Sequence, residues 1–143
     1  MFDTSAWVAL LEGEDDRAEH VQRLLETAEA GDLHILVSTL VISEVTKGPM
    51  ASDPPMSEED EQTFERYLES PFVSLVSVDP AVARRARDIR REHPKLRTPD
   101  AVMVATAIVA RAETLSGTDA GWSSRRRRRP ARSGRLCGGR RWH

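Results

Sequence analysis

Short apolar segments alternate along this chain with longer segments of helical periodicity, and this alternation constrains the fold more than any other feature. Strand signals occur at 34–38 and 72–78, and amphipathic helical patterns occur over 14–30 and 58–69. Alternating strands and helices predict a parallel sheet with helices on both faces, joined by right-handed crossovers. The sequence therefore predicts an α/β domain.

Capping residues mark where further helices begin and end. Ser, Thr or Asp before the first turn, Pro within it and Gly after the last turn are typical of these positions. Such signals occur at Gly13, Gly31, Ser38 or Thr39, Ser57, Asp79-Pro80 and Thr98-Pro99. We expect the helix that begins after Ser38 or Thr39 to reach Lys47. The last helix, with Thr98 as its N-cap, should reach Glu113 and be followed by a short strand over 114–117.

Charge divides the chain into two unlike parts. Residues 1–124 carry 12 basic and 23 acidic side chains, a net charge of −11, whereas 125–143 carry nine arginines and no acid. The second part has few apolar residues, so it cannot bury enough surface to offset the entropy of ordering itself. We expect one folded domain over 1–122 and a disordered, Arg-rich tail over 123–143.

The single cysteine and the absence of a long apolar run indicate a cytoplasmic, soluble protein. Cys137 cannot form an internal disulfide, and no segment approaches the roughly 18 apolar residues needed to span a bilayer. We therefore expect no membrane association.

Four carboxylates stand at the ends of predicted strands or on apolar helix faces, and they are the candidate functional residues. They are Asp3, Glu44, Asp100 and Asp119. In parallel sheets, ligands bind in the crevice outside the carboxyl ends of the strands, and we expect these four side chains to meet there.

Each carboxylate also has a purely structural explanation. Asp3 can be a helix N-cap, and Glu44 can pair with Lys47 at i+3. Asp100 lies in a first helical turn, where the helix dipole favours negative charge, and Asp119 can bond its own backbone in a turn. Considered together, the four positions are better explained by one shared site.

Carboxylates that converge in one crevice repel one another unless a cation lies between them. Ligands that are all oxygen favour Mg²⁺ or Mn²⁺ over Zn²⁺. Such an ion activates water and neutralises charge that builds on a phosphodiester. The acids therefore predict metal-dependent phosphodiester hydrolysis.

The strings MFDTSAW, VSTLVISEV, LRTPDAVMVATAIVARAE and LSGTDAGW, in this order, resemble the PIN-domain ribonucleases and, within them, the VapC-like toxins. The resemblance spans about residues 1–122. It implies a three-layer α/β/α fold with a short, mainly parallel central sheet of about four strands, the usual last strand being absent here. It also implies a Mg²⁺-dependent endoribonuclease, a homodimer and a small cognate antitoxin.

The resemblance assigns the catalytic and metal-binding roles residue by residue. The Asp-Thr-Ser string matches Asp3, Thr4 and Ser5, and the helix-borne Glu matches Glu44. The Arg-x-Pro-Asp-Ala string and the following Ala-Thr-Ala segment match Arg97, Pro99, Asp100, Ala101 and 105–107. The last acid matches Asp119, although Gly117 occupies the usual Thr position and Thr118 is adjacent.

Three arginines and three hydroxyl-bearing residues are candidates for substrate binding. Arg84, Arg87 and Arg91 form a helical stripe that either contacts RNA phosphates or is simply a solvated face. Thr4, Ser5 and Thr118 are the other candidates for substrate binding.

Both ends of the chain depart from the family pattern. Only Met1 and Phe2 precede Asp3, so we expect that the true start lies upstream. The Arg-rich tail replaces an expected apolar strand. Most of its residues are those that GC-rich codons encode when they are read out of frame. We therefore consider a frameshift, with an RNA-binding basic tail as the rival explanation. Three functions stay open: a toxin-like ribonuclease, an impaired protein that only binds antitoxin or RNA, and a non-toxic RNA-processing nuclease.

Overall fold

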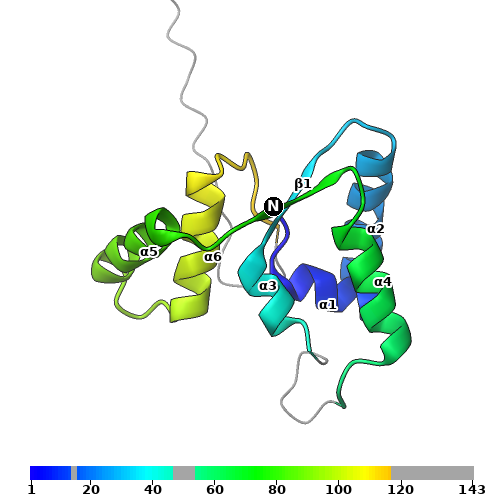
Figure 1. Cartoon of the computed structure of the whole chain (residues 1–143), viewed down its shortest axis with the longest axis horizontal. Helices are drawn as coiled ribbons and strands as arrows, with labels where there is room; N and C mark the ends of the chain where they lie inside the picture. The colour runs from blue at the N-terminus through cyan, green and yellow to red at the C-terminus, as the bar shows by residue number, and fades with distance from the viewer. Residues whose placement is uncertain (14–15, 47–53, 117–143) are drawn as a thin grey trace, which may run out of the picture.

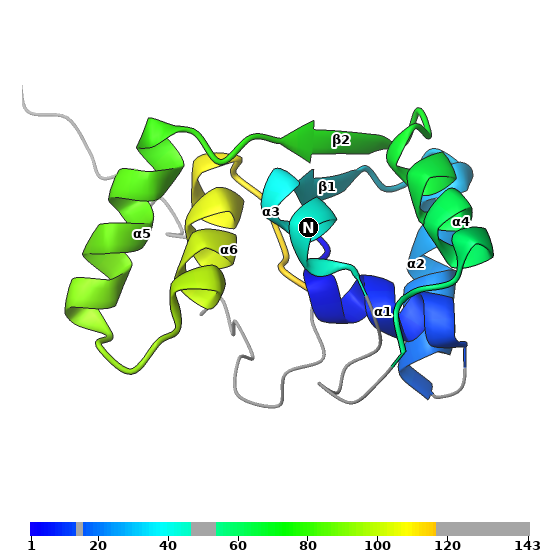
Figure 2. The same cartoon turned by 60° about the horizontal axis from the view of Figure 1, so that its bottom comes forward.

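A computed structural model describes residues 1–13, 16–46 and 54–116 of the 143-residue chain. Helices α1 to α4 lie in the first half of the chain, and α5 and α6 follow the second strand. The elements in chain order are α1 (Thr4–Glu12), α2 (Asp16–Glu29), β1 (Ile35–Ser38), α3 (Thr39–Glu44), α4 (Glu58–Leu68), β2 (Val73–Val76), α5 (Pro80–Glu92) and α6 (Thr98–Val109). Figures 1 and 2 show α1, α2 and α4 on one side of the strands, with α5 and α6 on the other side.

The sheet is short and parallel, which confirms the predicted α/β class. β1 pairs with β2 in parallel, from Ile35 opposite Val73 to Ser38 opposite Val76. Phe2 extends the sheet through single parallel bridges to Val37 on one side and to Ser116 on the other. Four chain segments therefore lie side by side in the order β2, β1, Phe2 and Ser116, and Asp3 immediately follows one of them.

Several helix ends are those that the sequence predicts. Asp79 caps α5 by accepting a hydrogen bond from the Val82 amide (2.9 Å), and Ser57 caps α4 by accepting one from the Asp60 amide (3.1 Å). Gly13 ends α1 in the left-handed region, at φ 68°, where its amide bonds the Ala9 carbonyl. A residue without a Cβ adopts this conformation at little cost.

Other predicted boundaries were wrong. Arg97, not Thr98, is the N-cap of α6. Its side chain makes no capping hydrogen bond to the first turn of the helix backbone. α6 ends at Val109 rather than at Glu113, because the chain turns at Arg111 with φ 56°. Within the described part of the predicted strand, residues 114–116, Ser116 forms a single parallel bridge to Phe2. α3 ends at Glu44, and Lys47 lies outside the described residues.

The main core fills the space between β1, β2 and helices α1, α2 and α4. Trp7 is fully buried and meets Phe64 edge to face at 5.2 Å between ring centroids and Phe2 at 5.7 Å. Leu25, Ile35, Val37 and Val41 surround the rings, as members of the same cluster of buried side chains. Burial of this apolar surface, at about 25 cal/mol per Å², provides the main driving force that holds the acidic N-terminal segment in place.

A second cluster joins α5 to α6. It contains Val82, Ala86 and Ile89 of α5 and Ala101 and Ala105 of α6. The small alanines let the two helices approach closely, and α5 packs along α6 at the outer edge of the fold (Figure 2). In the described part of the chain, no helix has the length and apolar character needed to cross a membrane.

The N-terminus is tied to the segment that follows α6. The Met1 α-amino group donates to the Thr114 carbonyl (2.6 Å), and the Ser116 amide donates to the Met1 carbonyl (2.8 Å). Desolvation by burial lowers the pKa of this α-amino group below its usual value. These bonds align the strand-like segment at 114–116 with Phe2 and fix the backbone that leads into Asp3.

Candidate functional site

Asp3 is held at the start of α1 by two hydrogen bonds to one carboxylate oxygen. Its Oδ1 accepts from the Ala6 amide (3.0 Å) and from the Ser5 hydroxyl (2.7 Å). The backbone of Asp3 is extended, which is the usual conformation of an N-cap. The predicted capping role is therefore confirmed, and it fixes the direction in which the carboxylate points.

Glu44 is joined to the segment around Asp3 by a side chain from the neighbouring residue. The Thr4 hydroxyl donates to Glu44 Oε2 (2.5 Å), although forty residues separate the two positions in the sequence. Glu44 is half-buried, at the last turn of α3. A half-buried carboxylate needs a hydrogen-bonding partner, and Thr4 provides one from the start of α1. This bond brings Asp3 and Glu44 into the same region of the molecule.

Asp100 lies in the first turn of α6, where the sequence places it, and it forms a two-point ion pair with Arg97. Arg97 Nε donates to Oδ2 (2.7 Å) and an Arg97 terminal nitrogen donates to Oδ1 (2.9 Å). The Asp100 side chain is 33% exposed and the Arg97 side chain 72% exposed. A planar guanidinium matches a carboxylate in this geometry, so Arg97 orients both oxygens of Asp100.

The helix termini that carry the three acids lie on the same side of the fold. Figures 1 and 2 show the start of α1, the end of α3 and the start of α6 all below the strands. α1 and α3 follow chain segments that pair in the parallel sheet, so their acids lie beyond the carboxyl ends of these segments. This is the side on which parallel α/β sheets bind ligands.

The fourth predicted acid, Asp119, and its neighbour Thr118 lie outside the described residues, as does the tail over 123–143. Over 1–13, 16–46 and 54–116, no three Asp, Glu, His or Cys side chains are close enough together to hold a metal ion. Asp3, Glu44 and Asp100 are each bonded to partners within the chain. Thr4 and Ser5, which the sequence suggested for substrate binding, donate their hydroxyls to two of the acids.

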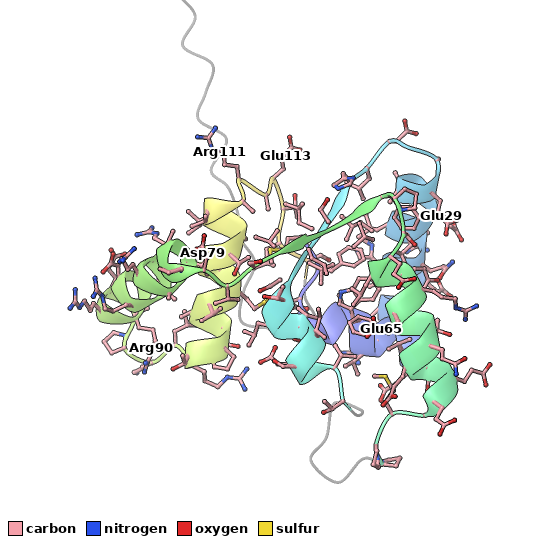
Figure 3. All side chains as sticks on the ribbon, in the orientation of Figure 1. Glu29, Glu65, Asp79, Arg90, Arg111 and Glu113 are labelled. Carbon is pink, nitrogen blue, oxygen red and sulfur yellow. The ribbon has the colours of Figure 1, made fainter. Side chains whose placement is uncertain are left out.

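The three arginines predicted to form a stripe on α5, Arg84, Arg87 and Arg91, are exposed, as the helical periodicity predicts. Asp88 is within ion-pairing distance of Arg87 (3.7 Å) and of Arg91 (3.6 Å), and Arg84 is also exposed. Figure 3 shows Arg90 at the end of the molecule formed by α5 and α6, and Glu65 beside α4 at the opposite end. The charge is thus separated, with a basic helix beside α6 and an acidic helix beside α1.

The fold is that of an α/β protein in which Asp3 and Glu44 follow paired segments of a parallel sheet and Asp100 lies in the first turn of α6. The family model described as PIN domain matches residues 1–127. The chain therefore belongs to the PIN-domain family. PIN domains are generally nucleases that depend on divalent metal ions. Among curated proteins, no sequence matches this chain.

The chemistry of the available donors fits a hard divalent ion. Asp3, Glu44 and Asp100 offer oxygen atoms, which Mg²⁺ and Mn²⁺ prefer to the sulfur and nitrogen ligands typical of Zn²⁺. Mg²⁺ is commonly held by one or two carboxylates and keeps several waters, so it does not require three protein ligands in contact.

Sequence reasoning did not find the contacts that orient the acids. The sequence motifs include Thr4 and Arg97, but they did not predict that Thr4 bonds Glu44 or that Arg97 bonds Asp100. The spacing of three residues between Arg97 and Asp100 is a signal that could have indicated the ion pair. The Thr4–Glu44 contact joins distant segments and has no comparable local signal.

Proposed function

We propose that this protein is a toxin-like endoribonuclease of a toxin–antitoxin pair, which hydrolyses RNA phosphodiester bonds at a carboxylate-bound Mg²⁺ or Mn²⁺ site. The observation that carries the proposal is the hydrogen bond from Thr4 to Glu44, which joins the first acidic segment to the glutamate of α3 in a PIN-domain chain. A hydroxyl between the two acidic segments keeps both carboxylates in one region of the molecule.

Asp3, Glu44 and Asp100, together with Asp119, would hold the ion. When bound, a divalent ion supplies an activated water and neutralises charge on the phosphate. Ser5 and the Ala6 amide hold Oδ1 of Asp3, which leaves the carboxylate in a fixed orientation. Thr4 does the same for Glu44, so the chain arranges its ligands before substrate arrives.

Arg97 is placed to contact the substrate backbone as well as Asp100. Its side chain is largely exposed beside Asp100, whose negative charge repels RNA phosphates. The exposed arginines of α5, on the helix packed against α6, would extend the same positive surface and contribute a salt-dependent attraction to RNA.

Exposed apolar side chains support the proposed protein partners, an antitoxin and a second copy of the chain. Large apolar residues with at least a third of their surface exposed occur before β1, on α3, in and just after β2, and on α6: Leu33, Ile42, Leu75, Val78, Ile108 and Val109. Such residues favour a protein–protein contact where they gather into a patch.

A second function, binding of antitoxin or RNA without cleavage, is favoured by one observation. Both oxygens of Asp100 are bonded to Arg97, so an ion must compete with a guanidinium for this ligand. If Asp100 stays bonded to Arg97 when the ion is present, Asp100 serves as a structural ion-pair partner and not as a metal ligand.

Induced expression separates these functions. Cells that express the wild-type chain should arrest growth and accumulate new RNA 5′ ends, whereas cells that express Asp100→Asn should do neither at the same protein level. New RNA ends without growth arrest would favour a non-toxic processing nuclease. Equal growth and unchanged RNA for both chains would favour the binding function.

A further inference from the structure

Two polar side chains in the described part of the chain are fully buried, and they face each other. Ser38 and Thr106 are each 0% exposed, and Ser38 Oγ lies 3.5 Å from Thr106 Oγ1. Ser38 is the N-cap of α3, and Thr106 lies within α6, between the buried residues Ala105 and Ala107. A hydroxyl is buried this deeply only where it finds hydrogen-bonding partners.

The surrounding bonds determine the direction of the Ser38–Thr106 hydrogen bond. Thr106 Oγ1 donates its one proton to the Val102 carbonyl (2.8 Å), so it can only accept from Ser38. Ser38 Oγ accepts from the Leu40 amide (3.3 Å) and retains its own proton for Thr106. A continuous chain of hydrogen bonds therefore runs from α3 to α6, and both hydroxyls are satisfied.

This contact lies at the same distance from two of the candidate ligands. Glu44 is six residues after Ser38 and Asp100 is six residues before Thr106, which corresponds to about 9 Å along each helix. Figures 1 and 2 show α3 and α6 running in opposite directions, so both acids lie on the same side of the contact. A slip of one helix along the other would change the separation between Glu44 and Asp100.

We propose that Ser38 and Thr106 are positioning residues, whose hydrogen bond sets α3 against α6 so that Glu44 and Asp100 face one divalent ion. This inference rests on the proposed nuclease function. Apolar side chains here would hold the helices together equally well, but dispersion contacts have little directionality. A hydrogen bond is directional and weakens steeply when distance or angle changes, and the Ser38–Thr106 bond is already long at 3.5 Å, so a small slip of either helix would break it.

The test compares Thr106→Val, which keeps the shape and removes the hydroxyl, with Thr106→Ser, which keeps the hydroxyl. Thr27→Val on α2 is the matched control, because the Thr27 hydroxyl also bonds the carbonyl four residues earlier (2.8 Å) but lies on the protein surface. Leu25→Ala, in the main core, controls for a general loss of stability. Circular dichroism first establishes that each variant is folded.

Two quantities are then measured for each folded variant: kcat and KM for RNA cleavage with Mg²⁺, and Mn²⁺ affinity without RNA, by electron paramagnetic resonance. For Thr106→Val we expect kcat to fall about tenfold or more and the Mn²⁺ dissociation constant to rise by a similar factor, as is usual when a residue that supports metal ligands is changed. Thr106→Ser and both controls should remain close to the wild type.

Other outcomes overturn the inference in distinguishable ways. If Thr106→Val cleaves RNA and binds Mn²⁺ as the wild type does, the hydroxyl pair does not position the acids. The same conclusion follows if Thr106→Ser is as impaired as Thr106→Val, or if Thr106→Val does not fold while Ser38→Ala folds with wild-type kcat and Mn²⁺ affinity. If the folded wild type itself neither cleaves RNA nor binds Mn²⁺, the proposed function fails, and the inference fails with it.

Discussion

The hydroxyl of Thr4 donates a hydrogen bond to Oε2 of Glu44, and this bond connects the first turn of α1 to the last turn of α3. The residue that follows one candidate metal ligand thereby orients another. The Asp-Thr-Ser string is thus a local structural unit in which Ser5 orients Asp3 and Thr4 orients Glu44.

Replacement of Thr4 by Val should impair cleavage more than stability. The variant leaves a half-buried carboxylate without this partner, at a cost of about 1–3 kcal/mol in unfolding free energy. Misorientation of Glu44 should lower kcat by about tenfold or more. Thr4→Ser retains the hydroxyl and is the control. Equal kcat values for Thr4→Val and Thr4→Ser would show that the bond has no catalytic role.

Two substitutions at Asp3 separate its capping role from its role as a ligand. Asn is as good an N-cap as Asp, so Asp3→Asn should unfold close to the wild type, whereas Asp3→Ala should lose about 1 kcal/mol. Both should lose RNA cleavage. Urea unfolding and cleavage assays on the same preparations provide the comparison.

Asp79→Asn is the matched control, because Asp79 caps α5 in the same way, through the Val82 amide. This variant should retain both stability and cleavage. If Asp3→Asn cleaves RNA as well as Asp79→Asn does, then Asp3 is a helix cap and nothing more.

Removal of the Arg97 side chain should strengthen metal binding. Arg97→Gln removes the guanidinium that bonds both oxygens of Asp100, and an exposed ion pair of this kind contributes at most about 1 kcal/mol to stability. We expect a lower Mn²⁺ dissociation constant with nearly unchanged unfolding, measured by calorimetric titration. An unchanged or weaker affinity would mean that Arg97 supports the ligand and does not compete for it.

Substitutions of Trp7 test how the core is stabilised, independently of function. Its ring is fully buried among Phe2, Phe64 and Tyr67, and its indole N–H finds no hydrogen-bond acceptor among the described residues. Trp7→Ala should lose about 3–5 kcal/mol of unfolding free energy. Trp7→Phe should lose clearly less, because it removes the unpaired donor while it retains an aromatic ring. Urea unfolding followed by circular dichroism gives both values, and equal losses would contradict this explanation.

Local sequence patterns predicted several helix ends correctly, but they did not predict where α6 ends. Asp79, Ser57 and Gly13 act as the caps that their residue types indicate, because capping depends on a few neighbouring backbone groups. The end of α6 was predicted four residues too late. Residues 110–113 favour a helix by propensity, but the chain must leave α6 early to place Ser116 beside Phe2.

The positions of three candidate acids in the fold were predictable from the sequence, whereas their contacts were not. The acids could be named from their positions after strands and in first helical turns, and the structure places Asp3, Glu44 and Asp100 at such positions. The bonds from Thr4 to Glu44 and from Ser38 to Thr106 span 40 and 68 residues. Such pairings depend on tertiary packing, which no local periodicity encodes.

Cleavage of total cellular RNA by purified protein shows whether the acids form a metal-dependent nuclease site. The wild type and Asp79→Asn should cleave RNA with Mg²⁺ or Mn²⁺. EDTA should abolish this cleavage, and Asp3→Asn and Asp100→Asn should lack it although both are folded. A folded wild type that cuts no RNA with either ion would contradict the account, as would cleavage that survives in EDTA or in both variants.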